Sequence, residues 1–515
     1  MGQTFRPTRE RDEKVGGVLT RMSLADSANI SFPTRSFPPV RVSTTIPRWS
    51  GVWLHTLVVS FVALTSYWYE PYIVLVVGGL VVTPTYIFLG FSEARRTPLF
   101  FNPLSFYFFW YSINFGVAAL YIASLIESGR SVGFSAAMVS PDYIGTAYVV
   151  SLCGSLSVHV GIRWLRPLES AGQKLDSLPE NEMLGGLIVM AAIGIAILLR
   201  PEWFTVFGNV IHALQSAPMA ALIIFGLLGR RYFRMNRDAF TLIFAAGTAF
   251  LFFVNLRSNS KAFLMFSFLP LLWMLLARRD LRRWLPAAIV PLALLYFLII
   301  APTVNKARAE SLARGETKGE HLLTAFSNID FSTASAIDTE SISKQFELFL
   351  GRQFDPIAAA YLVGRVEKDG YQMGATMEYA SYAFIPRVLW PEKPSVSRGD
   401  WFNKYVGAAP GTSLGITAIG ELYWNFGLPG VVIGMFVLGC GFGILWRMAG
   451  TDPLARPLHM LLYVIVTINC MVDMPQAVSI LVAQVSYGLI FSTVFALFEK
   501  QRRVSSAVKT GVKTL

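Results

Sequence analysis

The twenty residues Tyr72–Phe91, YIVLVVGGLVVTPTYIFLGF, carry no charged side chain. A helix of about 20 apolar residues, rising about 1.5 Å per residue, crosses the hydrocarbon core of a bilayer. Similar stretches recur along the 515 residues, which are 54% hydrophobic and only 15% charged, whereas soluble domains carry about 25% charged residues. With a mean hydropathy of +0.50, the sequence predicts an all-α polytopic membrane protein.

We expect about twelve transmembrane helices, nine before a long polar segment and three after it. They are predicted at roughly residues 51–68, 72–91, 104–124, 143–162, 184–200, 216–229, 239–256, 262–277, 285–301, 428–446, 457–472 and 476–498. The domain organisation that follows is a disordered basic cytoplasmic tail (1–48), transmembrane helices 1–9 (49–301), a large periplasmic insert (302–411), a re-entrant or interfacial segment (412–427), transmembrane helices 10–12 (428–498) and a cytoplasmic C-terminal tail (499–515).

The basic residues predict the orientation of the chain. With these spans, 20 Lys and Arg residues fall in the loops and tail of one side, and only Arg130, Arg200, Arg257 and Lys261 fall in the short loops of the other. Cytoplasmic loops of membrane proteins are the ones enriched in Lys and Arg. Both termini are therefore predicted in the cytoplasm. The net charge of +12 follows this topology rather than forming a basic patch, so we expect no nucleic-acid partner.

The insert 302–411 is then predicted outside the cytoplasm. It holds twelve of the 44 Lys and Arg residues and thirteen of the 32 Asp and Glu residues. Apolar residues recur in it at helical spacing, and its Tyr and Trp residues suit a membrane interface. We expect several short helices that cap the bundle as a lid, because loops of this length in compact proteins are usually functional or disordered.

Polar residues gather at the outer ends of the predicted spans. Arg257 and Lys261 share one short outer turn, where basic residues are disfavoured. Two interpretations remain open, namely snorkelling toward headgroups and an anion site for a lipid-borne diphosphate. Arg352, Arg387 and Lys393 of the insert are candidates to extend that site, and solvated charges or local ion pairs are the alternative.

The segment 412–427 carries Glu421, Tyr423 and Asn425 and is too interrupted by Gly and polar residues to span a bilayer. A re-entrant helix lining a polar cavity is one interpretation. The other is a lengthened start of span ten, with Glu421 in water. Within the spans, His55 is the main titratable residue, and a structural hydrogen bond is expected for it. The three cysteines and five histidines show no ligand spacing, so no metal site is indicated.

Two motifs resemble a known family. The stretch Phe384–Pro394, FIPRVLWPEKP, and the stretch Gly415–Gly430, GITAIGELYWNFGLPG, are similar to those of the Wzy-like polymerases of O-antigen and exopolysaccharide repeat units. Asn102-Pro103-Leu104-Ser105 and the turn around Arg257 fit the same pattern. The resemblance covers roughly residues 95–500, although its sharp motifs occupy about 40 residues.

The resemblance implies a GT-C-like fold in the bacterial inner membrane. It also implies a glycosyltransferase that needs no metal, nucleotide sugar or other cofactor and transfers a growing glycan from undecaprenyl diphosphate onto a lipid-linked repeat unit. The implied partners are the undecaprenyl-diphosphate-linked oligosaccharide and membrane lipid, with a chain-length regulator and a flippase as further candidates. An O-antigen-type ligase and a transporter or flippase of lipid-linked oligosaccharides are the alternatives.

This chemistry needs a base and a cationic site. A carboxylate can accept the proton of the attacking sugar hydroxyl, and Glu421 is the first candidate, with Glu378 and Asp473 behind it. Cationic groups stabilise the departing diphosphate. The candidate substrate-binding residues are Arg257, Lys261, Arg352, Arg387, Lys393, Tyr423 and Asn425.

Overall fold

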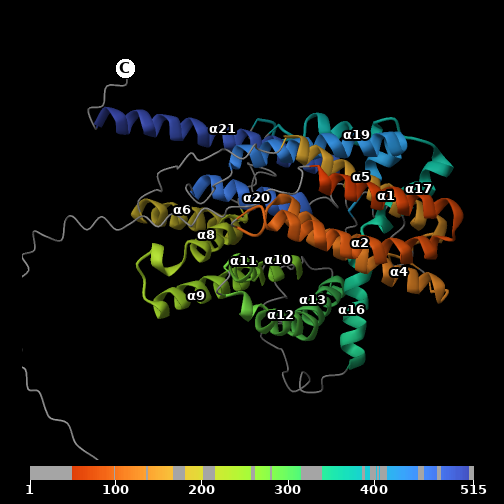
Figure 1. The fold of residues 1–515 in the computed structure, drawn as a ribbon, viewed down its shortest axis with the longest axis horizontal. Coiled ribbons are helices and arrows are strands. Elements are labelled where there is room, and N and C mark those ends of the chain that lie inside the picture. Colours follow the sequence, from red (N-terminus) through yellow and green to blue (C-terminus); the bar gives the residue numbers. More distant parts are fainter. Residues whose placement is uncertain are drawn as a thin grey trace, which may run out of the picture. The chain divides into compact units, whose positions relative to one another are not determined.

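The computed structural model describes residues 49–97, 99–130, 132–134, 137–165, 180–200, 215–256, 261–278, 281–314, 339–385, 389–394, 402, 405, 415–450, 457–472 and 477–509. In these ranges the only strands are β1 (Gly133–Phe134) and β2 (Ala137–Met138), which form a small antiparallel hairpin. Everything else that is regular is helical, which confirms the all-α prediction (Figure 1).

The first half of the helical part consists of α1 (Ser50–Trp68), α2 (Pro71–Ala94), α3 (Pro103–Tyr111), the π-helix η2 (Ser112–Val117), α4 (Ala118–Glu127), α5 (Pro141–Leu165), α6 (Glu180–Leu199), α8 (Ala217–Tyr232), α9 (Arg237–Leu256), α10 (Lys261–Phe266) and α11 (Leu269–Ala277). The second half consists of η4 (Arg282–Trp284), α12 (Leu285–Leu294), the π-helix η5 (Leu295–Ile300), α13 (Ala301–Arg314), α16 (Thr339–Gln353), α17 (Pro356–Asp369), η6 (Ala375–Ser381), α19 (Ala418–Ala449), α20 (Pro457–Val472) and α21 (Val478–Lys509).

Several helices are long and apolar enough to cross a membrane. Among the described residues seven stretches meet that condition, and they are Ser50–Trp68, Pro71–Ala94, Pro103–Glu127, Pro141–Leu165, Arg237–Leu256, Arg282–Ala307 and Ala418–Ala449. Shorter apolar helices, of 10–17 residues, occupy the positions of the other five predicted spans. The chain is therefore a multi-pass membrane protein, and the count of twelve spans stays a prediction.

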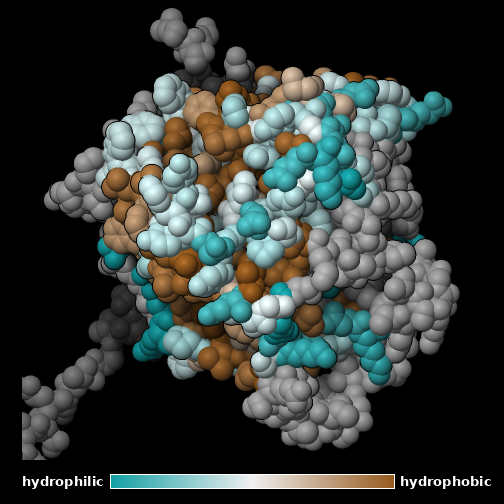
Figure 2. Space-filling view, turned by 90° about the vertical axis from the view of Figure 1, so that its right-hand side faces the viewer, coloured by the Kyte–Doolittle hydropathy of each residue, from teal (hydrophilic) through white to brown (hydrophobic). Residues whose placement is uncertain are grey.

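Large apolar side chains cover the outward faces of these helices. On α1 alone, Trp53 and Leu57 are each 68% exposed and Leu64 is 64% exposed. Figure 2 shows broad apolar areas on one face of the molecule. Water would penalise such surfaces, whereas lipid tails solvate them.

The helices α5 and α19 pack against each other at very short range, beside α17 (Figure 1). A Cβ atom at Gly439 of α19 would lie 2.5 Å from the carbonyl oxygen of Val158 on α5, and Gly161 faces the backbone of α19 in the same way. Small residues at such crossings let helix backbones approach within the membrane. The α5–α19 pair therefore forms the centre of the packed core that supports the candidate site.

The helix α19 consists of two parts. Gly427, with φ 66° and ψ −159°, separates Ala418–Phe426 from the longer helix that begins at Leu428. A positive φ with an extended ψ is essentially restricted to glycine. The first part thus forms its own short helix, capped by Thr417, whose Oγ1 accepts the N–H of Gly420 at 3.0 Å. The break at Gly427 agrees with the predicted interruption of the segment 412–427. The assignment of that segment as re-entrant or interfacial stays a prediction.

The described part of the insert is built from helices, but one of them does more than cover the bundle. The helix α17 packs against both α5 and α19 and buries most of its first nine residues. Phe354, just before it, stacks on Tyr148 of α5 with ring centroids 5.9 Å apart. The insert therefore contributes a helix to the packed core, which a lid over a rim would not do.

Candidate functional site

The structure places only part of the predicted site. Arg257, Arg387 and Asp473 lie outside the described residues, and Lys261 opens α10 without its side chain being among those described. Their proposed roles stay predictions. The remaining candidates belong to the insert and to the first part of α19.

Glu421 and Asn425 lie one helical turn apart and are both buried, with exposed fractions of 1% and 0%. The Oε2 atom of Glu421 accepts the backbone N–H of Val478, the first residue of α21, at 2.8 Å. Buried carboxylates need such partners, because an unpaired charge in the interior is costly. The alternative in which Glu421 lies in water is wrong.

Asn425 ties the insert to α19. Its Nδ2 atom donates to Thr376 Oγ1 at 2.6 Å and to the carbonyl of Glu421 at 2.7 Å, and its Oδ1 atom accepts the N–H of Gly374 at 2.8 Å. The backbone carbonyl of Asn425 accepts a further bond from Met373. Asn425 is therefore a positioning residue that fixes the segment 372–376 over the short helix carrying Glu421.

Lys393 is buried in the insert and bonds to backbone carbonyls. It is 5% exposed, and its Nζ atom donates to the carbonyl oxygens of Ala383 and Ile385, both at 2.8 Å. Tyr487 of α21 donates to the same two carbonyls at 3.4 Å. Lys393 thus closes the loop that carries the FIPRVLWPEKP motif, and its role at a diphosphate stays a prediction.

The other predicted residues are less enclosed. Glu378 on η6 and Arg352 at the end of α16 are exposed, and Tyr423 is half-buried against the core. In the described part of the chain, Glu421 bonds to Val478 and Asn425 and to none of these three side chains. The structure therefore unites Glu421 with Asn425 and leaves Glu378 and Arg352 as surface groups of the insert.

Both family-like motifs are held by the same helix. Glu421 of the second motif bonds to Val478 of α21, and the loop of the first motif bonds to Tyr487, nine residues further along. Nine helical residues span about 13.5 Å. The two motifs, which are separate in sequence, are therefore both anchored on the first half of α21.

A second enclosed acid, the partly buried Asp355, was missed by the sequence reasoning. Asp355 lies between α16 and α17. The amide nitrogen of Asn114 faces Asp355 and donates to its Oδ2 atom at 2.9 Å and to the carbonyl of Gln353. Its amide oxygen then accepts the Nε1–H of Trp110 at 2.9 Å. Asn114 belongs to the π-helix η2, near the middle of a predicted span, and π-bulges occur frequently at functional sites. An asparagine within an apolar span was the available signal.

Burial raises the pKa of Asp355 from its ordinary value to about 8. Between pH 4 and 8 the folded protein keeps this proton while the unfolded chain has lost it. Unfolding then releases a proton, so the contribution of Asp355 to stability falls as the pH rises through this window.

Asp355→Asn removes this titration. We expect the variant to gain thermal stability over the wild type from pH 5 to pH 8, by up to about 1.4 kcal/mol per pH unit. Thermal unfolding in detergent across this pH range measures the effect. Asp369→Asn, an exposed change on α17, is the control. A constant difference between the Asp355 variant and the wild type would contradict the assignment.

A third group of polar residues joins α1, α2, α3 and α5. His55 and His159, both fully buried, bond through their Nδ1 atoms at 3.2 Å. His55 Nε2 bonds to Tyr86 at 2.8 Å, so the structural hydrogen bond expected for His55 is present. Tyr86 and Tyr107 both bond to Ser155, at 2.9 and 2.8 Å.

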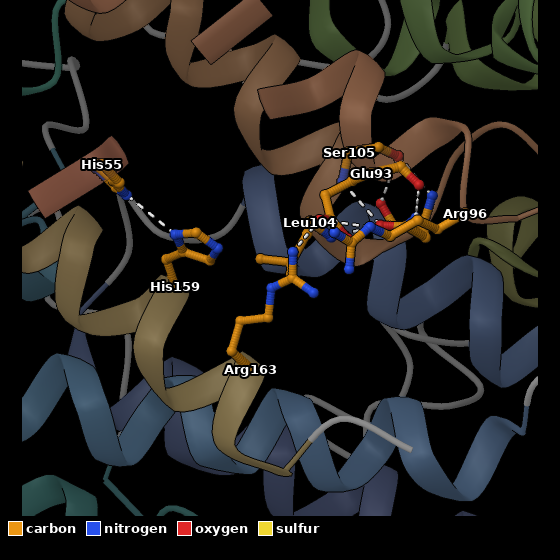
Figure 3. A network of polar contacts seen from close by, with 8 residues as sticks. His55, Glu93, Arg96, Leu104, Ser105, His159 and Arg163 are labelled. Carbon is orange, nitrogen blue, oxygen red and sulfur yellow. Dashed lines mark hydrogen bonds and ion pairs between the residues drawn. The ribbon is translucent and has the colours of Figure 1, made fainter. Parts of the chain in front are cut away.

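An ion pair lies beside these histidines (Figure 3). Glu93 and Arg163 are both buried and bonded to each other, and Arg96 lies 3.6 Å from Glu93. Asn102, in the NPLS motif, donates to the carbonyl of Glu93 at 3.0 Å and caps α3. The predicted spans ended before Glu93 and Arg163, so the sequence did not indicate that these two ionisable residues are buried. Their burial depends on helices that are remote in sequence.

Among the described residues, no group of three or more His, Cys, Asp and Glu side chains could hold a metal ion. No match was found when the chain was compared with protein-family models, with curated proteins and with solved structures.

Proposed function

We propose that this membrane protein is a polysaccharide polymerase with a GT-C-like fold and about twelve transmembrane helices. It transfers a growing glycan from undecaprenyl diphosphate onto a lipid-linked repeat unit at the periplasmic face of the bacterial inner membrane, with both termini in the cytoplasm. The observation that carries the proposal is the buried Glu421 on a short, separately capped helix within the GITAIGELYWNFG motif.

Glu421 is the general base of this proposal. Its carboxylate is oriented by the Val478 N–H, and the break at Gly427 separates its helix from the long spanning part of α19. A positioned base that takes the proton of the attacking hydroxyl contributes about 10²–10⁴ in rate. The segment held by Asn425 covers this helix, and exclusion of water strengthens the electrostatic interactions beneath it.

The departing diphosphate requires positive charge. In this proposal Arg257, Lys261 and Arg387 supply it, with Arg352 as an exposed group at the end of α16. Lys393 acts indirectly by closing the motif loop. Arg and Lys at headgroup level are suited to a lipid-borne diphosphate, since charge-assisted bonds to phosphate are about twice as strong as neutral ones.

A transporter of lipid-linked oligosaccharides is the second candidate. One observation favours it, namely the buried group of Glu93, Arg163, His55 and His159 within membrane helices. Ionisable residues inside the membrane often mark substrate or proton routes. The polymerase remains preferred because both family-like motifs are anchored on α21, whereas the buried group belongs to α1, α2 and α5.

A reconstitution assay separates the candidates. The purified protein, in liposomes without metal or nucleotide, receives undecaprenyl-diphosphate-linked repeat units. A ladder of longer lipid-linked glycans supports the polymerase. Units that only equilibrate across the bilayer support the transporter, and transfer to an added lipid A acceptor without a ladder supports the ligase.

The proposed diphosphate site predicts a second result in this assay. Arg257→Ala should lower the yield of long glycans at least tenfold, because the leaving diphosphate loses a cation. The control is Arg130→Ala, which removes an exposed arginine 3.7 Å from Glu347, a pairing of the kind that contributes little. Normal chain lengths from a well-expressed Arg257 variant would remove this residue from the site.

A further inference from the structure

The insert packs along one face of α21 just before and within its first family-like motif. Side chains from the two segments form one apolar cluster, which consists of Tyr379, Tyr382, Ala383, Ile480, Ala483, Tyr487 and Phe491. The four members from α21 recur at intervals of three and four residues, so they lie on the same face of the helix. From Ile480 to Phe491 this face is about 16.5 Å long. The insert therefore follows α21 for about three helical turns.

This contact reaches the middle of an apolar helix. The apolar part of α21 is Val478–Val494, and Tyr487 lies nine residues after its start. The Tyr487 hydroxyl donates to the carbonyl oxygens of Ala383 and Ile385 at 3.4 Å. The middle of a membrane span lies at the depth of the lipid hydrocarbon. Because α21 is the last predicted span, these two carbonyls are expected within the bilayer rather than in the water outside it.

The backbone of the loop 382–394 has the internal hydrogen bonds that such a depth requires. The Nζ atom of Lys393 donates to the carbonyls of Ala383 and Ile385, both at 2.8 Å. The Ile385 N–H donates to the Tyr382 carbonyl at 3.0 Å, and the Lys393 N–H donates to the Trp390 carbonyl at 3.1 Å. Three residues of this loop are prolines, which have no N–H to satisfy. Irregular backbone is tolerated at membrane depth where the protein satisfies its polar groups.

The outward-facing side chains of the loop are mostly apolar. Phe384 is 47% exposed, Leu389 is 74% exposed and Trp390 is 39% exposed. Water would penalise these surfaces, whereas lipid tails solvate them. Trp390 also contacts Tyr382, with ring centroids 5.5 Å apart, and both residue types are enriched at headgroup level. Glu392 is exposed as well, and a carboxylate in hydrocarbon is costly, so Glu392 belongs at the polar surface of the bilayer.

We propose that the loop 382–394 is embedded in the outer leaflet of the membrane. Phe384 and Leu389 lie among the lipid acyl chains, and Glu392 lies at headgroup level. The exposed face of the loop is thus covered by lipid hydrocarbon rather than by water or by another protein. Ile490 and Leu497 of α21, which are 49% and 62% exposed, face the same lipid phase. The inference rests on α21 as a membrane span and is independent of the proposed polymerase activity.

The test measures the environment of spin labels on the loop. In full-length protein with Cys153, Cys440 and Cys470 replaced by alanine, Phe384→Cys or Leu389→Cys carries a single nitroxide label. The labelled protein is placed in phospholipid nanodiscs, which leave both membrane surfaces open to solutes. Electron paramagnetic resonance then measures label collisions with O₂, which concentrates in hydrocarbon, and with a polar nickel chelate, which stays in water.

Two further positions calibrate these collisions. Leu497→Cys on α21 is the lipid-facing control, and Lys368→Cys, at an exposed position on α17, is the water-facing control. We expect the ratio of O₂ to nickel collisions at Phe384 and Leu389 to be about tenfold higher than at Lys368, because hydrocarbon excludes polar solutes. Ratios equal to that at Lys368 overturn the proposal. Low rates with both reagents, together with spin–spin coupling between labels, identify a second copy of the chain on this face and also overturn it.

Leu389→Asp provides a second measurement if the labelled variants do not fold. In water this change at a 74% exposed side chain would be nearly neutral, whereas in lipid the new charge is costly. We therefore expect the variant in nanodiscs to unfold at a lower temperature and to be cleaved by protease in the loop 382–394. Lys368→Asp, at its exposed position on α17, should do neither. An unchanged unfolding temperature with an uncleaved loop in Leu389→Asp overturns the proposal.

Discussion

Glu421→Gln is expected to lower glycan elongation by about 100-fold or more while the protein stays folded. Glutamine keeps a carbonyl oxygen that can accept the Val478 N–H now bonded to Glu421 at 2.8 Å. It cannot take a proton from a sugar hydroxyl, and loss of a positioned general base costs about 10²–10⁴ in rate. Chain elongation in liposomes measures the activity, and thermal unfolding measures the fold.

Two further variants sharpen this result. Glu421→Ala removes the acceptor as well and should lose both elongation and stability, since the buried Val478 N–H loses its partner. Glu378→Gln, at an exposed position on η6, should leave both elongation and stability close to the wild type if Glu421 is the base. Full elongation by a folded Glu421→Gln variant would show that this carboxylate is structural and would reopen the choice of base.

Lys393→Met is expected to give the largest loss of stability in the insert, about 3 kcal/mol or more. Methionine fills a similar volume but leaves the carbonyls of Ala383 and Ile385 without the ammonium that now donates to both at 2.8 Å. Each hydrogen bond to a charged group contributes about 1.5–3 kcal/mol. The loop 382–394 should then become sensitive to proteases well below the global unfolding temperature.

Lys368→Met on α17 is the matched control, because Lys368 is exposed and should tolerate the change. Tyr487→Phe removes only the weaker 3.4 Å bonds to the same carbonyls and should have a smaller effect. If Lys393→Met keeps its loop protected but loses elongation selectively, the lysine contacts substrate after all, and the original diphosphate interpretation returns.

The sequence predicted the helical class and the approximate helix positions because the requirement for about 20 apolar residues is local. The stretch Tyr72–Phe91 illustrates this, since it lies within α2. The seven long apolar stretches coincide with predicted spans for the same reason. The interruption before span ten was also visible, through Gly427 and its polar neighbours, although the broken geometry of α19 was not.

The site was predicted less well. Glu421 and Asn425 were identified by type, yet their partners, Val478 and Thr376, are 57 and 49 residues away in the sequence. Lys393 was predicted to bind an anion because it is a lysine in the insert, and in the structure its Nζ atom donates to backbone carbonyls. Asp355 was one of thirteen acids in a polar segment, and its neighbour Asn114 lies 241 residues before it.

The sequence by itself determined that this chain is a multi-pass helical membrane protein, because a membrane span requires a run of consecutive apolar residues. Only the tertiary structure decided which polar side chains are buried. Glu93, His159 and Arg163 look like ordinary span-end residues in the sequence, and they are buried together because α1, α2 and α5 pack side by side. Burial and pairing depend on neighbours brought from distant segments, and that information resides in the packing.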